Sequence, residues 1–338
     1  SIVSRANALF VLAACLALWP PAGADVLEEL WHVDLVSASR SLPLPVDYDG
    51  DGEQEVFFTT RFDGMVWRVS AQGRVTGQYQ RANWLDGSLT VTTAPGHRPR
   101  LMAYQESTGR INLVDFQTEY NVRLDVPGIP QIGTMPCFAD LNRNGRQEIV
   151  VTRRSGTIVA LDRNLNVLWQ YNGGAPFHSS PAAAPVFNDG PALFAQSEDG
   201  VLHGVHGSGR PLWRFRTQHP AAPFPSQSDP LAIELQSGSP CVLVLTLSER
   251  GELAVLSASG ILLRNAALPK GNYVARPLLA DVDADGSLEV LVATRDWSIL
   301  AATIDGAIEL ERQIQGSALE GLVLSDVNGD GFLELLAV

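Results

Sequence analysis

DYDGDGEQEVFF, at residues 47–58, is the stretch of sequence that decides the fold, because it recurs along the chain. Its three further copies keep the order of acidic or amide residues, the glycine and the apolar ending; they are DLNRNGRQEIVV at 140–151, DVDADGSLEVLV at 281–292 and DVNGDGFLELLA at 326–337. Their starts are separated by close to two, three and one units of about 46 residues. An internal repeat of this length is typical of solenoids and β-propellers.

Weaker copies of the same unit fill the gaps between the four clear ones. Each reads as a loop, an apolar strand, a glycine turn, a second strand, another turn and a third strand that often contains Leu-Trp, as at 168–169 and 212–213. Counted this way, units start near residues 45, 91, 139, 184, 231, 279 and 323. Short β-branched or aromatic runs between Gly and Asp turns indicate an all-β repeat, and 40–50 residues is the size of a four-stranded propeller blade.

The two ends of the chain suggest how the ring closes. The last unit stops after one strand at Val338, whereas residues 30–35 resemble a third strand with no earlier strands before it. In a closed ring an N-terminal strand of this kind completes the last blade and removes exposed edges. We therefore predict an all-β, seven-bladed β-propeller whose seventh blade is incomplete at the C-terminus, with an N-terminal strand closing the ring. An eight-bladed ring in a longer parent and a β-sandwich stay open as alternatives.

The first 24 residues have the composition of a secretory signal peptide. Arg5 precedes an apolar run at residues 8–19, and Pro20 and Pro21 separate that run from the small residues 22–24. The run is shorter than the roughly 20 residues that span a bilayer. We predict a signal peptide over 1–24, cleaved after Ala24, and a C-terminally truncated propeller over 25–338, secreted or periplasmic. A lipoprotein anchored through Cys15 and a buried helix of the fold are the alternatives.

The charge of the chain excludes some classes of partner. The formal net charge is −13, with 24 basic and 37 acidic residues. A nucleic-acid-binding protein needs a basic face, and adsorption to anionic lipid needs basic residues as well. Three cysteines make no disulfide framework, and Cys137 and Cys241 either pair or stay as buried thiols. We expect no nucleic-acid partner and no transmembrane segment.

In each clear copy, acidic or amide residues fall at positions 1, 3, 5 and 9, with glycine at position 6. Alternate oxygens on a tight loop can converge on one ion, and position 7 can offer its backbone carbonyl. Oxygen ligands without His or Cys favour Ca²⁺. The predicted ligands are Asp47, Asp49, Asp51, Glu53 and Glu55; Asp140, Asn142, Asn144, Arg146 and Glu148; Asp281, Asp283, Asp285, Ser287 and Glu289; and Asp326, Asn328, Asp330, Phe332 and Glu334.

The four proposed sites differ in charge, so we expect them to differ in affinity. The first copy has five carboxylates, and the second has only Asp140 and Glu148, opposed by Arg143 and Arg146. The second copy is therefore predicted to bind Ca²⁺ most weakly. None of the four is an EF-hand loop, because position 12 is Phe, Val, Val or Ala instead of the bidentate Glu. Solvated turns without an ion are the alternative.

These loops resemble the calcium-binding repeats of the FG-GAP/VCBS class, through the pattern Asp-x-Asp-x-Asp-Gly-x-x-Glu followed by an apolar strand. The Phe-Gly and Gly-Ala-Pro signatures of integrin repeats are absent, so the resemblance is to the broader bacterial class. Residues 155–162, leading to Trp169, and residues 199–205, leading to Trp213, resemble PQQ-like propeller repeats. Together the two resemblances cover nearly all of 25–338 and imply a propeller fold, while leaving function open.

The sequence gives little sign of catalytic chemistry. His203 and His206 are three residues apart in a strand-like segment and so face opposite ways. His178-Ser179-Ser180-Pro181 could pair a base with a nucleophile, but similar repeats carry a structural turn there. We expect a calcium-stabilised module that binds a protein or glycan. The alternatives are a calcium-dependent polysaccharide lyase and a divergent PQQ-dependent dehydrogenase.

Overall fold

The structure is a computed structural model, and it describes part of the chain. The described residues are 11–17, 28–35, 37, 39, 41–80, 85, 88–92, 101–105, 111–115, 121–124, 134–217, 229–237, 239–248, 250–269, 273, 276–281, 287–294, 298–313, 322–329 and 334–337. They contain β-strands and turns but no helix, so none of them forms a helix that could cross a membrane. The all-β prediction is confirmed for these residues.

The described strands form seven four-stranded antiparallel sheets, each named here by its place along the chain. The first sheet is β3 (Leu44–Val46), β4 (Glu55–Thr60), β5 (Met65–Val69) and β6 (Val75–Gln80), and the second is β7 (Thr90–Val91), β8 (Leu101–Gln105), β9 (Ile111–Asp115) and β10 (Asn121–Leu124). The third is β11 (Cys137–Ala139), β12 (Glu148–Thr152), β13 (Thr157–Leu161) and β14 (Val167–Asn172), and the fourth is β15 (Ala182–Phe187), β16 (Gly190–Gln196), β17 (Val201–His206) and β18 (Pro211–Arg216). The fifth is β19 (Leu231–Ser237), β20 (Ser239–Leu247), β21 (Glu252–Ser257) and β22 (Leu262–Ala267), and the sixth is β23 (Leu278–Ala280), β24 (Glu289–Ala293), β25 (Ser298–Thr303) and β26 (Ile308–Gln313). The closing sheet joins both ends of the chain in the order β2 (Glu28–Leu35), β1 (Val11–Ala17), β28 (Glu334–Ala337) and β27 (Leu322–Ser325).

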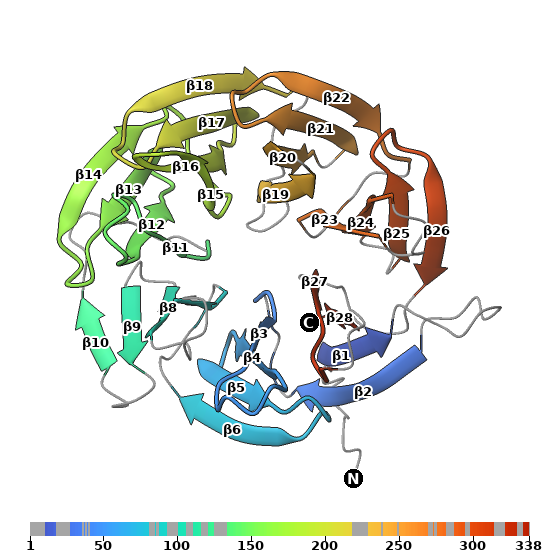
Figure 1. Ribbon diagram of the computed structural model, residues 1–338. Coiled ribbons are helices and arrows are strands. Elements are labelled where there is room, and N and C mark those ends of the chain that lie inside the picture. Colours follow the sequence, from blue (N-terminus) through green and yellow to red (C-terminus); the bar gives the residue numbers. More distant parts are fainter. Residues whose placement is uncertain are drawn as a thin grey trace, which may run out of the picture.

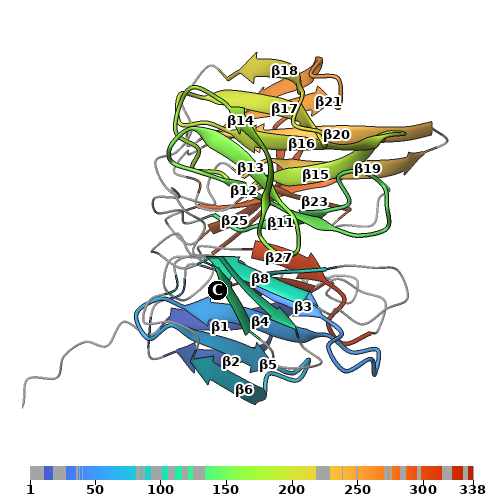
Figure 2. The same cartoon turned by 90° about the vertical axis from the view of Figure 1, so that its left-hand side faces the viewer.

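The sheets stand around a common centre, which makes the molecule a β-propeller. Figure 1 shows β3, β11, β15, β19, β23 and β27 innermost, with β6, β10, β14, β18, β22, β26 and β2 on the circumference. Figure 2 shows the same ring from the side. Within a sheet each strand pairs with the next, so the end of the second strand and the start of the first lie at the same end of the sheet.

The predicted arrangement of blades needs correction. Within the described residues, five sheets are regular blades of consecutive strands with three or more residues each, namely the first, third, fourth, fifth and sixth. The inner strand of the second sheet has two residues, and the closing sheet combines two strands from each end of the chain. An incomplete last blade closed by one N-terminal strand is therefore wrong, because β1 lies between β2 and β28 and completes the sheet.

Apolar side chains fill the space between neighbouring sheets. The buried residues form seven clusters, and each cluster contains residues from two adjacent sheets. Successive strand residues point to opposite faces, so Phe57 packs toward the second sheet while Phe58 packs toward the closing sheet. This explains why the second and third strands are continuously apolar: both of their faces are buried.

Three tryptophans on outermost strands join their sheet to the next one. The indole Nε1 donates to a turn carbonyl of the following sheet, from Trp31 to Ala71 at 2.8 Å, from Trp169 to Gly207 at 2.9 Å and from Trp213 to Ala258 at 2.8 Å. The glycine two residues after each carbonyl has a positive φ and lies under the indole ring. The three tryptophans therefore pack between neighbouring sheets, and Trp31 shows that β2 is the outer strand of the closing sheet.

Candidate functional site

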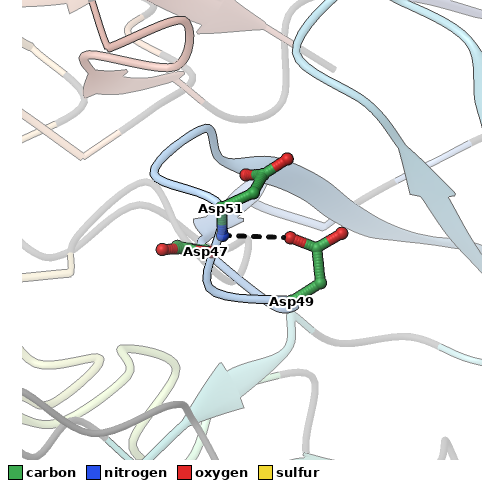
Figure 3. A group of neighbouring side chains, drawn as sticks. All are labelled: Asp47, Asp49 and Asp51. Atoms are coloured by element: carbon green, nitrogen blue, oxygen red, sulfur yellow. Dashed lines mark hydrogen bonds between the residues drawn. The ribbon is translucent and has the colours of Figure 1, made fainter.

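The first acidic loop connects β3 to β4 and brings three carboxylates together. Figure 3 shows Asp47, Asp49 and Asp51, and each offers a ligand oxygen within 4.8 Å of the others. Asp47 accepts backbone hydrogen bonds from Gly50 at 2.6 Å and Gly52 at 3.3 Å, while Asp49 Oδ1 accepts from Asp51 at 3.3 Å. Asp49 and Asp51 are exposed. The loop thus presents converging oxygens to solvent, at separations that a Ca²⁺ ion with ligands about 2.4 Å away can span.

The glutamate at position 9 holds these loops closed. Its Oε2 accepts a hydrogen bond from the backbone N–H of position 2, from Tyr48 to Glu55 at 2.9 Å, from Leu141 to Glu148 at 2.9 Å and from Val327 to Glu334 at 2.8 Å. The pKa of Glu55 and that of Glu148 lie above the ordinary value, mainly because the carboxyl groups are partly buried. The backbone hydrogen bond from position 2 acts in the opposite direction and lowers the pKa. The predicted role of these glutamates as metal ligands stays a prediction; the structure gives them a structural role.

The second loop has the same backbone but a different set of side chains. Both oxygens of Asp140 are used, accepting from Asn144 at 3.0 Å and Gly145 at 2.7 Å. Asn142 and Asn144 each accept one further backbone hydrogen bond within the loop. Position 4 has a positive φ, 56° at Arg143, where the first loop has Gly50 at 81°. The loop fold therefore does not depend on clustered carboxylates, because Asn142 and Asn144 stand where the first loop has Asp49 and Asp51.

The third and fourth loops are only partly described. Asp281, Ser287 and Glu289 belong to the described residues of the third loop, and Asp326, Asn328 and Glu334 to those of the fourth. The predicted ligands Asp283, Asp285, Asp330 and Phe332 lie outside the described residues. Glu289 and Glu334 are buried at the start of their strands, paired with the last residue of the preceding strand. Their position repeats that of Glu55 and Glu148.

The histidines and serines considered for catalysis make structural contacts. In β17, His203 bonds to Tyr171 and Ser197, both at 3.0 Å, whereas His206 bonds to Ser208 and Asp189 on the opposite face. The prediction that His203 and His206 point to opposite faces of the strand is confirmed. His178 Nε2 lies 3.5 Å from a carboxylate oxygen of Glu198. The hydroxyl groups of Ser179 and Ser180 bond to other residues, Gln196 and Met135.

Ser179 and Ser180 bond to backbone groups of other segments. Ser179 Oγ donates to Gln196 O at 3.0 Å and accepts from Gln196 N at 2.7 Å, and Ser180 Oγ accepts from Met135 N at 2.9 Å. These contacts agree with the structural turn expected at Pro181. They also tie the start of β15 to the third sheet.

The structure shows further groups that the sequence pattern did not reveal. Some buried side-chain atoms without a hydrogen-bond partner belong to residues at the ends of second strands or just before inner strands; they include Arg153 Nε, Gln196 Nε2, Asp229 Oδ2 and Arg276 Nε. None belongs to a recognisable motif. Only the repeat alignment, in which Arg153 and Gln196 fall at or beside the ends of second strands, could have pointed to them.

An exposed apolar run lies on the circumference of the ring. Ile261, Leu262 and Leu263 are 63, 41 and 40% exposed at the start of β22, the outermost strand of the fifth sheet. Outer strand β26 instead alternates half-buried and exposed residues, with Glu309 and Glu311 facing solvent. The apolar run differs in this from β26, and it lies on a sheet edge whose backbone groups can pair with another strand.

Comparison with known proteins places the chain among propellers. Residues 143–319, just over half of the chain, match the family model described as outer membrane protein assembly factor BamB. The structure resembles BBS1N in complex with ARL6DN, with a TM-score of 0.66 at 12% identity over 96% of this chain and 97% of that chain. It also resembles BamB from Moraxella catarrhalis, with a TM-score of 0.52 at 15% identity over 89% of this chain and 99% of that chain. No curated protein matches the sequence.

Proposed function

The chain belongs to the family described as outer membrane protein assembly factor BamB, and on that premise we propose that it is a scaffold that binds another protein. The PQQ-like resemblance of its repeats agrees with this family, while the FG-GAP/VCBS resemblance stays a prediction. Two of the similar structures are titled as complexes of BBS1N with ARL6DN, so a propeller of this shape can hold a protein partner. A protein ligand is thus favoured over the glycan that the sequence left open.

The observation that carries this proposal is the apolar run at residues 261–263. Three consecutive apolar side chains on an outer edge strand favour contact with a partner's apolar surface or extended strand. On the neighbouring circumference, β14 exposes Val167 and Leu168 at 46 and 48%. Figure 1 shows β14, β18 and β22 following one another around the rim, so one partner can reach both strands.

Site-specific photo-crosslinking tests the proposal. A photoreactive amino acid at Leu262 is expected to give one defined adduct with a partner in cells of the source organism, identified by mass spectrometry. The same amino acid at Glu309, exposed on outer strand β26, is the matched control and should give none. Ile261→Glu in the Leu262 variant should abolish the adduct. Equal adducts at both positions, or none at Leu262, would contradict an interface on β22.

A calcium ion at the first acidic loop is a second proposal, favoured by the three converging carboxylates of Asp47, Asp49 and Asp51. The ion would neutralise their mutual repulsion and stiffen the turn between β3 and β4. The second loop is not proposed as a site of comparable strength, because Asn142 and Asn144 occupy the positions of the carboxylates Asp49 and Asp51 in the first loop. The third and fourth loops stay predictions.

We further propose that the protein acts in the periplasm or outside the cell, as the apolar N-terminal run implies. The structure uses residues 11–17 of that run as β1, so cleavage after Ala24 and retention of β1 exclude each other. Anchoring through Cys15 is the alternative form of export. The mass of the exported protein distinguishes a chain that begins at Asp25 from one that begins at an acylated Cys15.

A further inference from the structure

The second acidic loop carries an Asn-Gly pair in an exposed turn. Asn144 and Gly145 occupy positions 5 and 6 of this loop, and both residues are exposed. Glycine has no side chain to hinder its backbone nitrogen, so that nitrogen can attack the side-chain amide of the preceding asparagine. The attack releases ammonia and forms a cyclic succinimide, which water opens to aspartate or isoaspartate. The other Asn-Gly pairs of the chain are at 172–173 in the third sheet and at 328–329 in the partly described fourth loop.

A carboxylate accepts the N–H that must lose its proton in this reaction. Gly145 N donates to Asp140 Oδ2 at 2.7 Å. A general base acts at about 2.6–3.2 Å from the atom that carries the proton. Asp140 Oδ1 accepts from Asn144 N at 3.0 Å, so two bonds from the loop hold the carboxylate in place. The loop fold itself creates this contact, since Gly52 N donates to Asp47 at 3.3 Å at the same place in the first loop.

A backbone donor polarises the amide that is attacked. The side-chain oxygen of Asn144, Oδ1, accepts a hydrogen bond from Arg146 N at 2.8 Å. Negative charge develops on this oxygen when a nitrogen adds to the amide carbon, and a donor already aimed at the oxygen stabilises that charge. The same bond identifies the other branch of the amide as Nδ2, the group that departs as ammonia.

The Asn-Gly pair of the third sheet differs from this one in what accepts the glycine N–H. Asn172 ends β14, and its Oδ1 accepts from Gly174 N at 3.0 Å, so its amide is polarised in a similar way. Gly173 N donates to the carbonyl oxygen of Gly156 at 2.8 Å, however, and a carbonyl oxygen is far too weak a base to take the proton. A Cβ atom on Gly173 would lie 2.5 Å from the Phe177 ring, so the pair is also closely packed. The chain thus contains its own unreactive counterpart.

We propose that Asn144 is a self-catalysed deamidation site, in which Asp140 takes the proton from Gly145 N. The nitrogen forms a bond to Cγ of Asn144 while the N–H of Arg146 stabilises the charge on Oδ1. The bond from Cγ to Nδ2 then breaks, and Nδ2 leaves as ammonia with the proton. Water adds to the succinimide and opens it, and the aspartate product has a carboxylate where the first loop has Asp51. The reaction depends neither on the scaffold proposal nor on calcium at the first loop.

Peptide mapping by mass spectrometry tests this site, through the loss of amide at each Asn-Gly pair while the full chain is incubated. Chelator in the buffer keeps cations away from Asp140. In the folded protein Asn144 should deamidate at least roughly tenfold faster than Asn172, because the second pair must first leave the β13–β14 ladder. In urea the two rates should converge, and the rate at Asn144 should fall. Equal native rates, or a faster reaction of Asn144 in urea, overturns the proposal.

Asp140→Asn tests the proton acceptor. The variant keeps an oxygen at loop position 1 without the negative charge, and it should slow deamidation of Asn144 at least roughly tenfold. Asp47→Asn makes the same change in the first loop and should leave the rate at Asn144 unchanged. Asn172 reports on folding, because a partly unfolded variant frees that pair and speeds its reaction. An unchanged rate at Asn144 in Asp140→Asn overturns the proposal, and the comparison of native and urea rates decides it without any variant.

Discussion

The indole Nε1 of Trp169 lies 2.9 Å from the carbonyl oxygen of Gly207, which belongs to the next sheet of the ring. The same relationship joins Trp31 to Ala71 and Trp213 to Ala258. Each bond satisfies a part-buried indole donor and helps to fix the angle between two neighbouring sheets. The outer strand of one sheet thereby depends on a turn of its neighbour.

Gly209→Ala is expected to destabilise the protein by about 2–4 kcal/mol. Gly209 has a φ of 84°, and a Cβ atom there would lie 2.8 Å from the Trp169 ring. Gly174→Ala is the matched control, because Gly174 has a φ of 95° and nothing within 4 Å of the added atom. It should cost only the backbone strain, about 1 kcal/mol. Urea unfolding measures both, and equal losses would show that the indole contact contributes nothing.

The repeat in the sequence was enough to predict the all-β propeller, because that fold follows from periodic spacing. The closing sheet was mispredicted, since composition alone read residues 11–17 as part of a leader and could not show their pairing with β2 and β28. The acidic loops were found from their spacing, but the loop-closing role of Glu148 was not, because a ligand and a hydrogen-bond acceptor look alike in sequence. Arg153 could not be singled out from the sequence, because only the three-dimensional structure shows that its buried Nε has no hydrogen-bond partner.

Calcium is expected to raise the melting temperature, and Asp49→Asn combined with Asp51→Asn should remove that effect. At a Ca²⁺ concentration about one hundred times the Kd, the added stability is about 2.7 kcal/mol. In the absence of Ca²⁺ the double variant should be at least as stable as the wild type, because it relieves repulsion between carboxylates. Asp140→Asn in the second loop is the control. A melting temperature that is the same in Ca²⁺ and in chelator would exclude the site.

Arg143→Gly is expected to stabilise the protein by about 0.5–1 kcal/mol. Arg143 has a φ of 56°, and glycine occupies the same loop position at Gly50 and Gly329, with φ of 81° and 74°. The gain is modest, because glycine also loses more freedom on folding. Arg146→Gly, three residues on, should destabilise the protein, since Arg146 is not in the left-handed region. Chemical unfolding distinguishes the two signs, and a loss for Arg143→Gly would mean that its side chain contributes more than the strain costs.

Acid should destabilise the protein partly through His203. Burial, with a smaller contribution from Arg214, lowers the pKa of His203 from 6.5 to about 4. The hydrogen-bond partners determine the tautomer of the neutral ring. Ser197 donates its hydroxyl proton to Asp199, so it accepts a hydrogen bond from the Nε2–H of His203. Nδ1 is then unprotonated and accepts a hydrogen bond from the Tyr171 hydroxyl. Protonation favours the unfolded state, so stability is full above pH 6.5 and falls as the pH drops toward 4, by roughly 3 kcal/mol at most.

His203→Gln should make the free energy of unfolding less sensitive to pH in that window. The variant loses stability at neutral pH, because it gives up one of the two hydrogen bonds of the ring. The difference between wild type and variant should therefore shrink from pH 7 to pH 4. A constant difference across this range would show that His203 titrates normally. His32, exposed on β2, gives a histidine control substituted in the same way.

Removal of residues 1–24 is expected to expose the backbone of β28. In the structure β1 lies between β2 and β28 and pairs with Glu334–Ala337, while β2 pairs with the other edge of β1. A chain that begins at Asp25 keeps the contact of Trp31 with Ala71, which holds β2 to the first sheet, but loses the strand that joins β2 to β28. Hydrogen exchange at residues 334–337 should rise strongly in that chain, with little change at residues 55–60 of the first sheet. Unchanged protection would mean that another segment pairs with β28 after export, and would assign the apolar run 11–17 to targeting alone.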